Sequence, residues 1–282
     1  MLKITIELKK EIAKLGRTLF IGCSHTMGFL DPGDNYGCYP WQDNNYAEIY
    51  AKENNKPVVI MASAGAGNAL WPRFLSFALQ KFNDIDEVFV QSTYWGRFPV
   101  AINPDLDERS IFPIDFFIEE APPEGDLIKR YALGFYQEQY VEYYLKPKRE
   151  DFEQTPYLRN TKPFLSEPDV RRSSHMYMQM WHYSNTHLEQ YDYFKDILTC
   201  DALCLYNEKK MHLWNINERC FIPKETDNYL TNLKATQIAN IDAITYLRHQ
   251  GHDIGMVDPE HYDTPTHEKI AKEYIPYIKE TQ

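Results

Sequence analysis

The sequence predicts an α/β protein of three layers, in which a parallel sheet lies between two layers of helices. Three short apolar segments in the first hundred residues have the composition of strands that are buried on both faces. Segments with apolar residues at helical spacing separate these strands. Strands that alternate with helices at such short intervals favour a parallel sheet that helices cover on both sides.

The predicted elements follow one another closely between residues 18 and 94. Strands are expected at residues 18–24, 57–64 and 86–94, and helices at residues 41–55 and 69–82. The second of these helices places Leu70, Phe74 and Phe77 on one face. A turn of small residues after the second strand marks the boundary between that strand and the helix.

The pattern changes after residue 96. Residues 97–174 are rich in Pro, Tyr, Phe and acidic residues, and they are too many for an ordinary connection. We therefore predict a large aromatic-rich insertion or lid, with a helix within residues 126–145, in a single domain over residues 1–282. Beyond it we expect a helix, broken once, at residues 176–210, a strand at 211–216 and an amphipathic helix at 266–280.

The charge and composition argue against several classes of partner. With 30 Lys and Arg against 41 Asp and Glu, the formal net charge is −11, and this field repels nucleic acid and anionic membranes. No apolar run is long enough to span a bilayer, and residues 1–16 lack the apolar stretch and cleavage site of a signal peptide. We therefore expect a cytoplasmic protein that binds neither nucleic acid nor a membrane.

A serine follows the first predicted strand, in the sequence Gly-Cys-Ser-His-Thr over residues 22–26. Ligands of open α/β sheets bind at the carboxyl ends of the strands, where this turn lies. Ser24 would present its hydroxyl there, and its backbone N–H could stabilise a developing oxyanion. Alternatively, Ser24 only caps the helix that follows.

Two further segments have residues suited to acyl transfer. Gly65 follows the second strand, and its backbone N–H could be a second oxyanion donor, although an ordinary turn is the alternative. Asp258 precedes His261 by three residues, so it could orient an imidazole that takes a proton from Ser24. A polar loop that caps the last helix is the alternative for this segment.

In order and position, these three segments resemble the conserved blocks of the SGNH (GDSL-type) hydrolase family. Gly22-Cys23-Ser24 matches its first block, Gly65 its second, and Asp258 to His261 its last, just before the C-terminal helix. The resemblance covers roughly the first hundred and the last thirty residues. It implies a flavodoxin-like sheet, a catalytic triad of Ser24, His261 and Asp258, and hydrolysis of a carboxylic ester, such as an acyl group on a carbohydrate.

The sequence departs from that family at two positions. Cys23 stands where the family has Asp, and residues 90–95 stand where its third block, G-x-N-D, would supply an Asn donor. The oxyanion hole would then depend on the backbone N–H groups of Ser24 and Gly65, and loss of one donor costs about 100- to 1000-fold in rate. Candidates for an additional donor are Ser92, Thr93 and Arg97. A weakly active or inactive SGNH-like binding or assembly module is therefore the alternative function.

The remaining polar candidates concern substrate and metal binding. His25, Asn68 and Arg97 are candidate substrate contacts, with a small acyl ester or an acylated glycan as the expected ligand. The aromatic residues between 94 and 193 either line a sugar or acyl cleft or pack the insertion. The histidines near the C-terminus lack the spacing of a metal motif, and no dinucleotide or Walker motif occurs, so we predict no metal and no cofactor. Free thiols are expected at Cys23, Cys38, Cys200, Cys204 and Cys220.

Overall fold

The structure is a computed structural model. It describes residues 16–27, 45–62, 68–92, 99–101, 117–120, 127–133, 140–142, 186–217, 232–257 and 261–281. The predictions for residues 1–15, for the turn at Gly65 and for Asp258, Thr93 and Arg97 lie outside these residues.

A seven-stranded sheet forms the centre of the molecule, in the order β5-β6-β2-β1-β3-β8-β9. Six strands are parallel, and β5 at one edge is antiparallel to β6. The strands are β1 (Arg17–Gly22), β2 (Val58–Ala62), β3 (Ile85–Ser92), β5 (Phe117–Glu120), β6 (Ile128–Leu133), β8 (Lys210–Asn215) and β9 (Thr236–Ile238). The predicted three-layer fold with a flavodoxin-like parallel sheet is thus confirmed.

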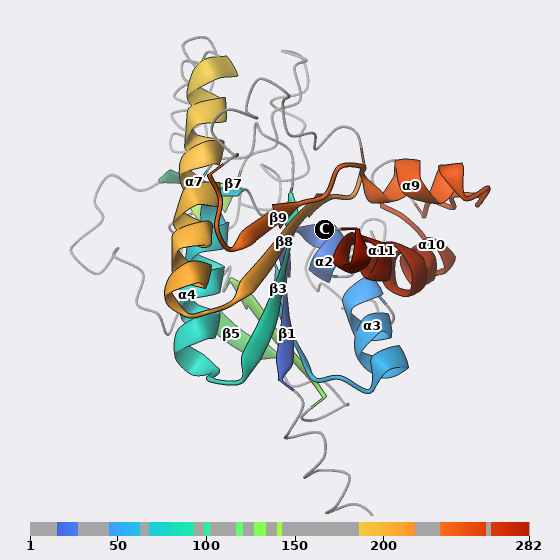
Figure 1. The fold of residues 1–282 in the computed structure, drawn as a ribbon, viewed down its shortest axis with the longest axis horizontal. Helices are drawn as coiled ribbons and strands as arrows, with labels where there is room; N and C mark the ends of the chain where they lie inside the picture. The colour runs from blue at the N-terminus through green and yellow to red at the C-terminus, as the bar shows by residue number, and fades with distance from the viewer. Residues whose placement is uncertain are drawn as a thin grey trace, which may run out of the picture.

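Helices cover both faces of this sheet (Figure 1). On one side lie α4 (Trp71–Lys81), after the short turn η1 (Asn68–Leu70), and α7 (Thr186–Tyr206). On the other side lie α3 (Tyr46–Asn54), α9 (Ala243–His249), α10 (Thr264–Lys269), the π-helical turn η6 (Ile270–Tyr274) and α11 (Ile275–Glu280). The expected helices at residues 41–55, 69–82 and 266–280 are therefore present, with their ends moved by a few residues.

The prediction of a helix within residues 126–145 is wrong. This range contains β6, which pairs with β2 in the central sheet, and β7 (Tyr140–Glu142), which pairs with β4 (Pro99–Ala101) in a separate two-stranded sheet. The range 97–174, predicted as an insertion or lid, thus supplies two strands of the main sheet. The helix prediction failed at Arg130. This residue is buried in β6 because it forms an ion pair with Glu48 of α3. A pattern of apolar residues does not identify a buried arginine, since the burial of an arginine depends on a partner elsewhere in the chain.

Alternate residues of the central strand β1 point into two separate apolar layers. Phe20 packs on the α3 side together with Phe89 of β3, and the two rings are stacked with centroids 5.1 Å apart. Leu19 and Ile21 face the α4 and α7 side. The strands are therefore buried on both faces, as their nearly continuous apolar composition predicted. On the α7 side Tyr193 packs edge-on against Trp71, so this aromatic residue of the range 94–193 belongs to the core.

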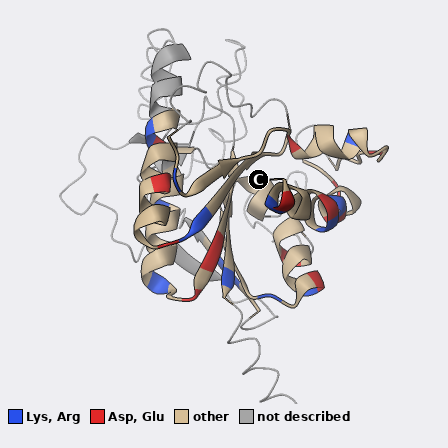
Figure 2. Ribbon diagram, viewed as in Figure 1, with Lys and Arg blue, Asp and Glu red and all other residues tan. Residues whose placement is uncertain are grey.

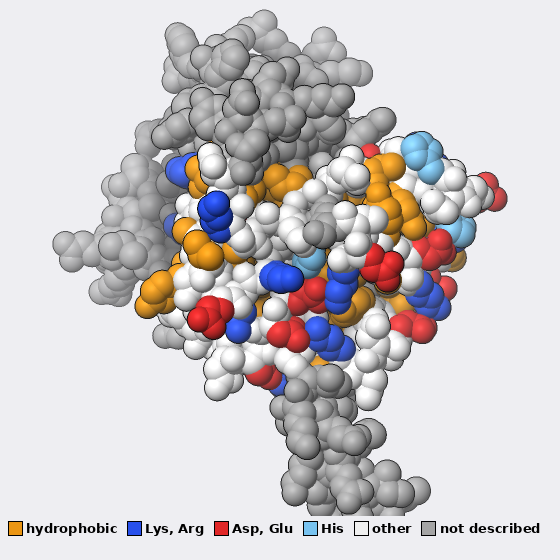
Figure 3. Space-filling view, in the orientation of Figure 1, with side chains coloured by type: hydrophobic (Ala, Val, Ile, Leu, Met, Phe, Trp, Pro, Cys, Tyr) orange, Lys and Arg blue, Asp and Glu red, His pale blue; other side chains and the backbone are white. Residues whose placement is uncertain are grey.

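Charged residues of both signs lie on the helices of both layers (Figure 2). On the face drawn in Figure 3, acidic and basic side chains of the described residues intermingle and do not separate by sign. No helix among the described residues is both long enough and apolar enough to span a membrane.

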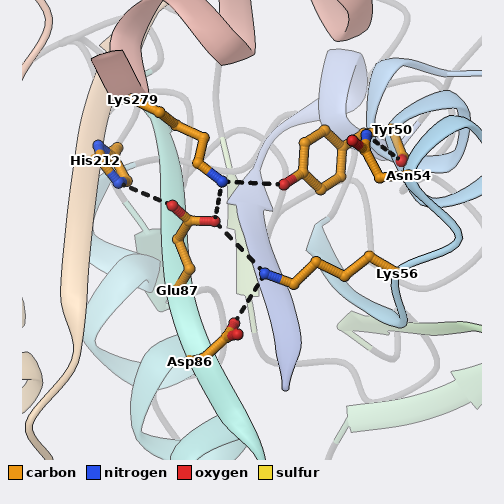
Figure 4. Close-up of polar contacts among 7 residues, drawn as sticks. All are labelled: Tyr50, Asn54, Lys56, Asp86, Glu87, His212 and Lys279. Atoms are coloured by element: carbon orange, nitrogen blue, oxygen red, sulfur yellow. Dashed lines mark hydrogen bonds and ion pairs between the residues drawn. The ribbon is translucent and has the colours of Figure 1, made fainter. Parts of the chain in front are cut away.

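Glu87 organises a polar cluster near the amino end of β3 (Figure 4). It lies 2.9 Å from Lys279 Nζ of α11, 3.3 Å from His212 Nε2 of β8 and 3.8 Å from Lys56 Nζ, which precedes β2. Burial raises the pKa of Glu87, but hydrogen bonds from His212 and Lys279 outweigh it and lower the pKa to about 2. The cluster connects α11 to the end of the sheet that lies opposite the carboxyl end of β1.

Candidate active site

Ser24 begins the short helix α2 (Ser24–Met27), and only Cys23 separates it from the end of β1. The turn between them is tight because Gly22 has no side chain. A Cβ at position 22 would overlap Thr26 Oγ1 and would lie 2.9 Å from Gln91 Oε1. Ser24 is buried, with 3% of its surface exposed. The fold thus places this serine at the carboxyl edge of the sheet, beside the central strand.

His261 reaches the same edge from the other end of the chain. Its Nε2 lies 2.9 Å from Ser24 Oγ, although the two residues are 237 positions apart in the sequence. The loop that carries His261 is held by its backbone, since Val257 N–H donates to the His261 carbonyl at 3.0 Å. Asp263 then caps α10 by accepting a hydrogen bond from the Thr266 N–H at 2.9 Å. The position of the imidazole therefore depends on the loop and on the start of the last helix.

The contact between Ser24 and His261 has the geometry of a nucleophile and its general base. A neutral imidazole accepts the hydroxyl proton at Nε2, which makes the serine oxygen more nucleophilic. Both residues are less than one-tenth exposed. In such a site a fixed hydrogen bond is stronger than it would be in water.

The other predicted site residues lie at different places around this contact. Ser92 ends β3, and its hydroxyl is 3.1 Å from Tyr193 OH on the α7 side of the sheet. Asn68 is buried at the start of η1, in the loop region after β2. His25 is buried next to Ser24. The roles of Gly65, Asp258, Thr93 and Arg97 stay predictions, because these residues lie outside the described part of the chain.

An aromatic group adjoins the contact between Ser24 and His261 and was not foreseen from the sequence. The ring of His25 lies 5.1 Å from that of His261 and is stacked on Tyr262 at 5.5 Å, centroid to centroid. The hydroxyl of Tyr262 accepts a hydrogen bond of 3.0 Å from Asn217 Nδ2. Asn217 lies just beyond the carboxyl end of β8. A polar residue directly after a predicted strand is a candidate site residue, and this position is the sequence signal for Asn217.

His267 is a second buried histidine near His261. Burial and, to a lesser extent, the neighbouring His261 lower the pKa of His267, Asp263 raises it, and the result is a pKa of about 4. His267 is therefore neutral at pH 7, and its ring is stacked on Tyr46 with centroids 5.8 Å apart. His261 is the histidine that contacts Ser24, whereas His267 packs on Tyr46.

The described residues contain no group of three or more His, Cys, Asp and Glu side chains that could hold a metal ion. His252, one of the histidines weighed as a metal ligand, has its Nε2 2.7 Å from Glu273 Oε2. Cys23, Cys200 and Cys204 are free buried thiols. Burial raises the pKa of Cys204 to about 12 and that of Cys200 well above its ordinary value. These two cysteines of α7 therefore carry protonated thiols and pack in the core.

Comparison with known proteins finds a similarity to solved structures but no match to a family model or to a curated protein. A solved structure of a carbohydrate esterase, whose active site displays divergent catalytic and non-catalytic binding functions, is similar with a TM-score of 0.44 and 13% sequence identity. The similarity covers 94% of this chain and 64% of that chain. This chain therefore spans less than two-thirds of the length of that structure.

Proposed function

We propose that the protein is a serine esterase of the SGNH type, with Ser24 as nucleophile and His261 as general base. The observation that carries the proposal is the distance of 2.9 Å between Ser24 Oγ and His261 Nε2 at the carboxyl edge of the sheet. The order of the three sequence segments, which resembles the SGNH hydrolases, supports the same reading. In the proposal Asp258 orients the imidazole of His261 through its other ring nitrogen.

The reaction would proceed in two acyl-transfer steps. Ser24 Oγ attacks the carbonyl carbon of the ester while His261 Nε2 takes the hydroxyl proton. The oxyanion accepts hydrogen bonds from the backbone N–H groups of Ser24 and Gly65. The intermediate then collapses, the bond to the alkoxide breaks, and His261 returns the proton to the departing oxygen, which leaves as an alcohol.

The second step hydrolyses the acyl-enzyme. A water molecule attacks the acyl carbonyl while His261 takes one of its protons. When the bond to Ser24 breaks, the serine oxygen recovers that proton and the carboxylic acid is released. The substrate class that we propose is a small acyl ester, including an acyl group on a carbohydrate. The resemblance to the SGNH hydrolases is the basis for this substrate class.

A fluorophosphonate probe tests the nucleophile directly, because it labels only an activated serine. We expect the wild-type protein to be labelled and Ser24→Ala to be unlabelled. Ser76→Ala is the matched control, since Ser76 lies on α4 and accepts an exposed hydrogen bond of 3.1 Å from Gln80. A folded wild-type protein without labelling would contradict the esterase proposal and favour an SGNH-like binding module.

A further inference from the structure

We infer that a buried hydrogen-bond chain from Tyr46 through Thr26 to Gln91 positions the turn that carries Ser24. This inference rests on the proposed function and names positioning residues for it. Gln91 comes from β3, Thr26 from α2 and Tyr46 from the first position of α3. All three are fully buried, with 0% of their surface exposed.

The amide of Gln91 contacts the serine turn on both sides of Ser24. Its Oε1 lies 2.8 Å from Thr26 Oγ1, two residues after the serine. Its Nε2 lies 3.5 Å from Cys23 Sγ, directly before the serine, and also donates to the Ser92 carbonyl at 3.0 Å. The side chain of Gln91 therefore joins the turn to the end of β3.

The direction of the hydrogen bonds follows from the chemistry of the three groups. An amide oxygen only accepts, so Thr26 must donate its hydroxyl proton to Gln91 Oε1. The oxygen of Thr26 can then accept from Tyr46 OH, which lies 2.6 Å away. Burial raises the pKa of Tyr46 well above its ordinary value, so the phenol keeps the proton that it donates. The Tyr46 hydroxyl thus donates to Thr26, and the Thr26 hydroxyl donates to Gln91.

Tyr46 provides a rigid end to this chain. Its ring packs edge-on against Trp214 of β8, with centroids 5.2 Å apart, and is stacked on His267 of α10. Thr26 is therefore held between the start of α3 and the amide of β3. Cys23, which replaces the Asp of the resembled family, has no carboxylate to accept bonds from the turn. The chain through Thr26 and Gln91 holds the turn from the neighbouring strand and helix instead.

Positioning matters because acyl transfer depends steeply on the direction of the attacking oxygen. A displacement of about 1 Å at a reacting group can cost roughly 100-fold in rate. Ser24 Oγ must keep its 2.9 Å contact with His261 Nε2, and its backbone N–H must stay directed at the oxyanion. The side chains of Thr26 and Gln91 form hydrogen bonds with each other and with Tyr46, Cys23 and the Ser92 carbonyl, so they act on Ser24 through the turn.

The decisive variants are Thr26→Val, which keeps the shape but removes the hydroxyl, and Thr26→Ser, which restores it. We expect Thr26→Val to lower the second-order rate of fluorophosphonate labelling and the kcat for a short-chain aryl ester by roughly 10- to 100-fold, with little change in KM. Thr26→Ser should recover most of that loss. Thr199→Val is the control, since Thr199 lies on the exposed side of α7 and donates to the Lys195 carbonyl.

The outcomes separate this inference from the proposed function. Loss of rate in Thr26→Val, with recovery in Thr26→Ser and circular dichroism unchanged, supports it. Labelling of Thr26→Val at the wild-type rate would overturn the inference and leave the esterase proposal standing. Equal loss in Thr26→Val and Thr26→Ser, in proportion to lowered melting temperatures, would also overturn it, because stability alone would then explain the rates. Absence of labelling in the wild type would overturn both proposals.

Discussion

Arg130 of β6 and Glu48 of α3 form an ion pair that is closed to solvent on both sides, with side-chain exposures of 4% and 0%. Glu48 Oε1 also accepts a hydrogen bond of 3.1 Å from Asn45 Nδ2, the residue that caps α3. The pair therefore joins strand β6 to the helix whose first residue, Tyr46, contacts Thr26 in the serine turn.

Removal of one member of this pair should destabilise the fold strongly. We expect Arg130→Met to lower the free energy of unfolding by about 3–5 kcal/mol, because it leaves the Glu48 carboxylate buried without its counter-ion. The double variant Glu48→Met with Arg130→Met should be less destabilised than the sum of the single changes. Urea unfolding measures each value.

The control for that prediction is an exposed ion pair between α3 and η6. Lys272 Nζ lies 3.2 Å from Glu53 Oε1, and both side chains are about half exposed. Lys272→Ala should change the free energy of unfolding by less than about 1 kcal/mol. Equal effects of Arg130→Met and Lys272→Ala would contradict the importance of the buried pair.

The cluster around Glu87 should make stability depend on pH in acid. The folded-state pKa of Glu87 is lowered from 4.5 to about 2. The contribution of the Glu87 carboxylate to stability is therefore fully present above pH 4.5 and is lost as the pH falls toward 2. Glu87→Gln should flatten the stability profile in this window. Thermal unfolding between pH 2 and pH 5 measures the slope, and an unchanged slope in Glu87→Gln would assign the acid sensitivity to other groups.

His267 should act in a separate pH window. Burial lowers its folded-state pKa from 6.5 to about 4, so the unfolded chain takes up a proton first as the pH falls. Stability should therefore rise with pH between about 4 and 6.5. His267→Phe keeps a ring against Tyr46 but removes the proton site, and it should flatten that part of the profile. His249→Phe, on the exposed end of α9, is the control and should leave the slope as it is in the wild type.

Loss of His261, the proposed base, or of Asp258, which is proposed to orient it, should remove turnover. We expect His261→Ala and Asp258→Ala to lower the kcat for a short-chain aryl ester by about 10⁴-fold or more. Asp253→Ala is the control for the aspartate, because Asp253 is exposed and only its backbone carbonyl is bonded, to Lys269 Nζ at 2.8 Å. Full activity in His261→Ala would exclude it as the base, whatever the result for Asp258.

Most of the central sheet could be predicted from the sequence. Strands β1, β2 and β3 have nearly continuous apolar composition because both of their faces are buried, and this composition is visible in the sequence. Strand β6 could not be predicted in the same way. Its Arg130 is buried by a charge on α3, and only the folded chain brings that charge near.

The candidate site was predictable in place but not in its supporting contacts. Ser24 and His261 belong to segments that end at the carboxyl edge of a parallel sheet, so their approach follows from element order. Tyr262, Asn217, Thr26 and Gln91 have no sequence motif. Thr26 comes from α2 and Gln91 from β3, while Tyr262 and Asn217 lie in loops at that edge.

The sequence by itself determined strands β1, β2, β3 and β8 and helices α3, α4 and α7, and it indicated which chemical groups end at one edge of the sheet, because local composition and spacing encode both. Only the tertiary structure decided that Ser24 Oγ lies 2.9 Å from His261 Nε2 and that Gln91 Oε1 lies 2.8 Å from Thr26 Oγ1 in the turn that carries Ser24. A distance of this kind depends on the register of neighbouring strands and on the packing of α3 and α10 against them. Those relationships join residues far apart in the chain, and no local pattern records them.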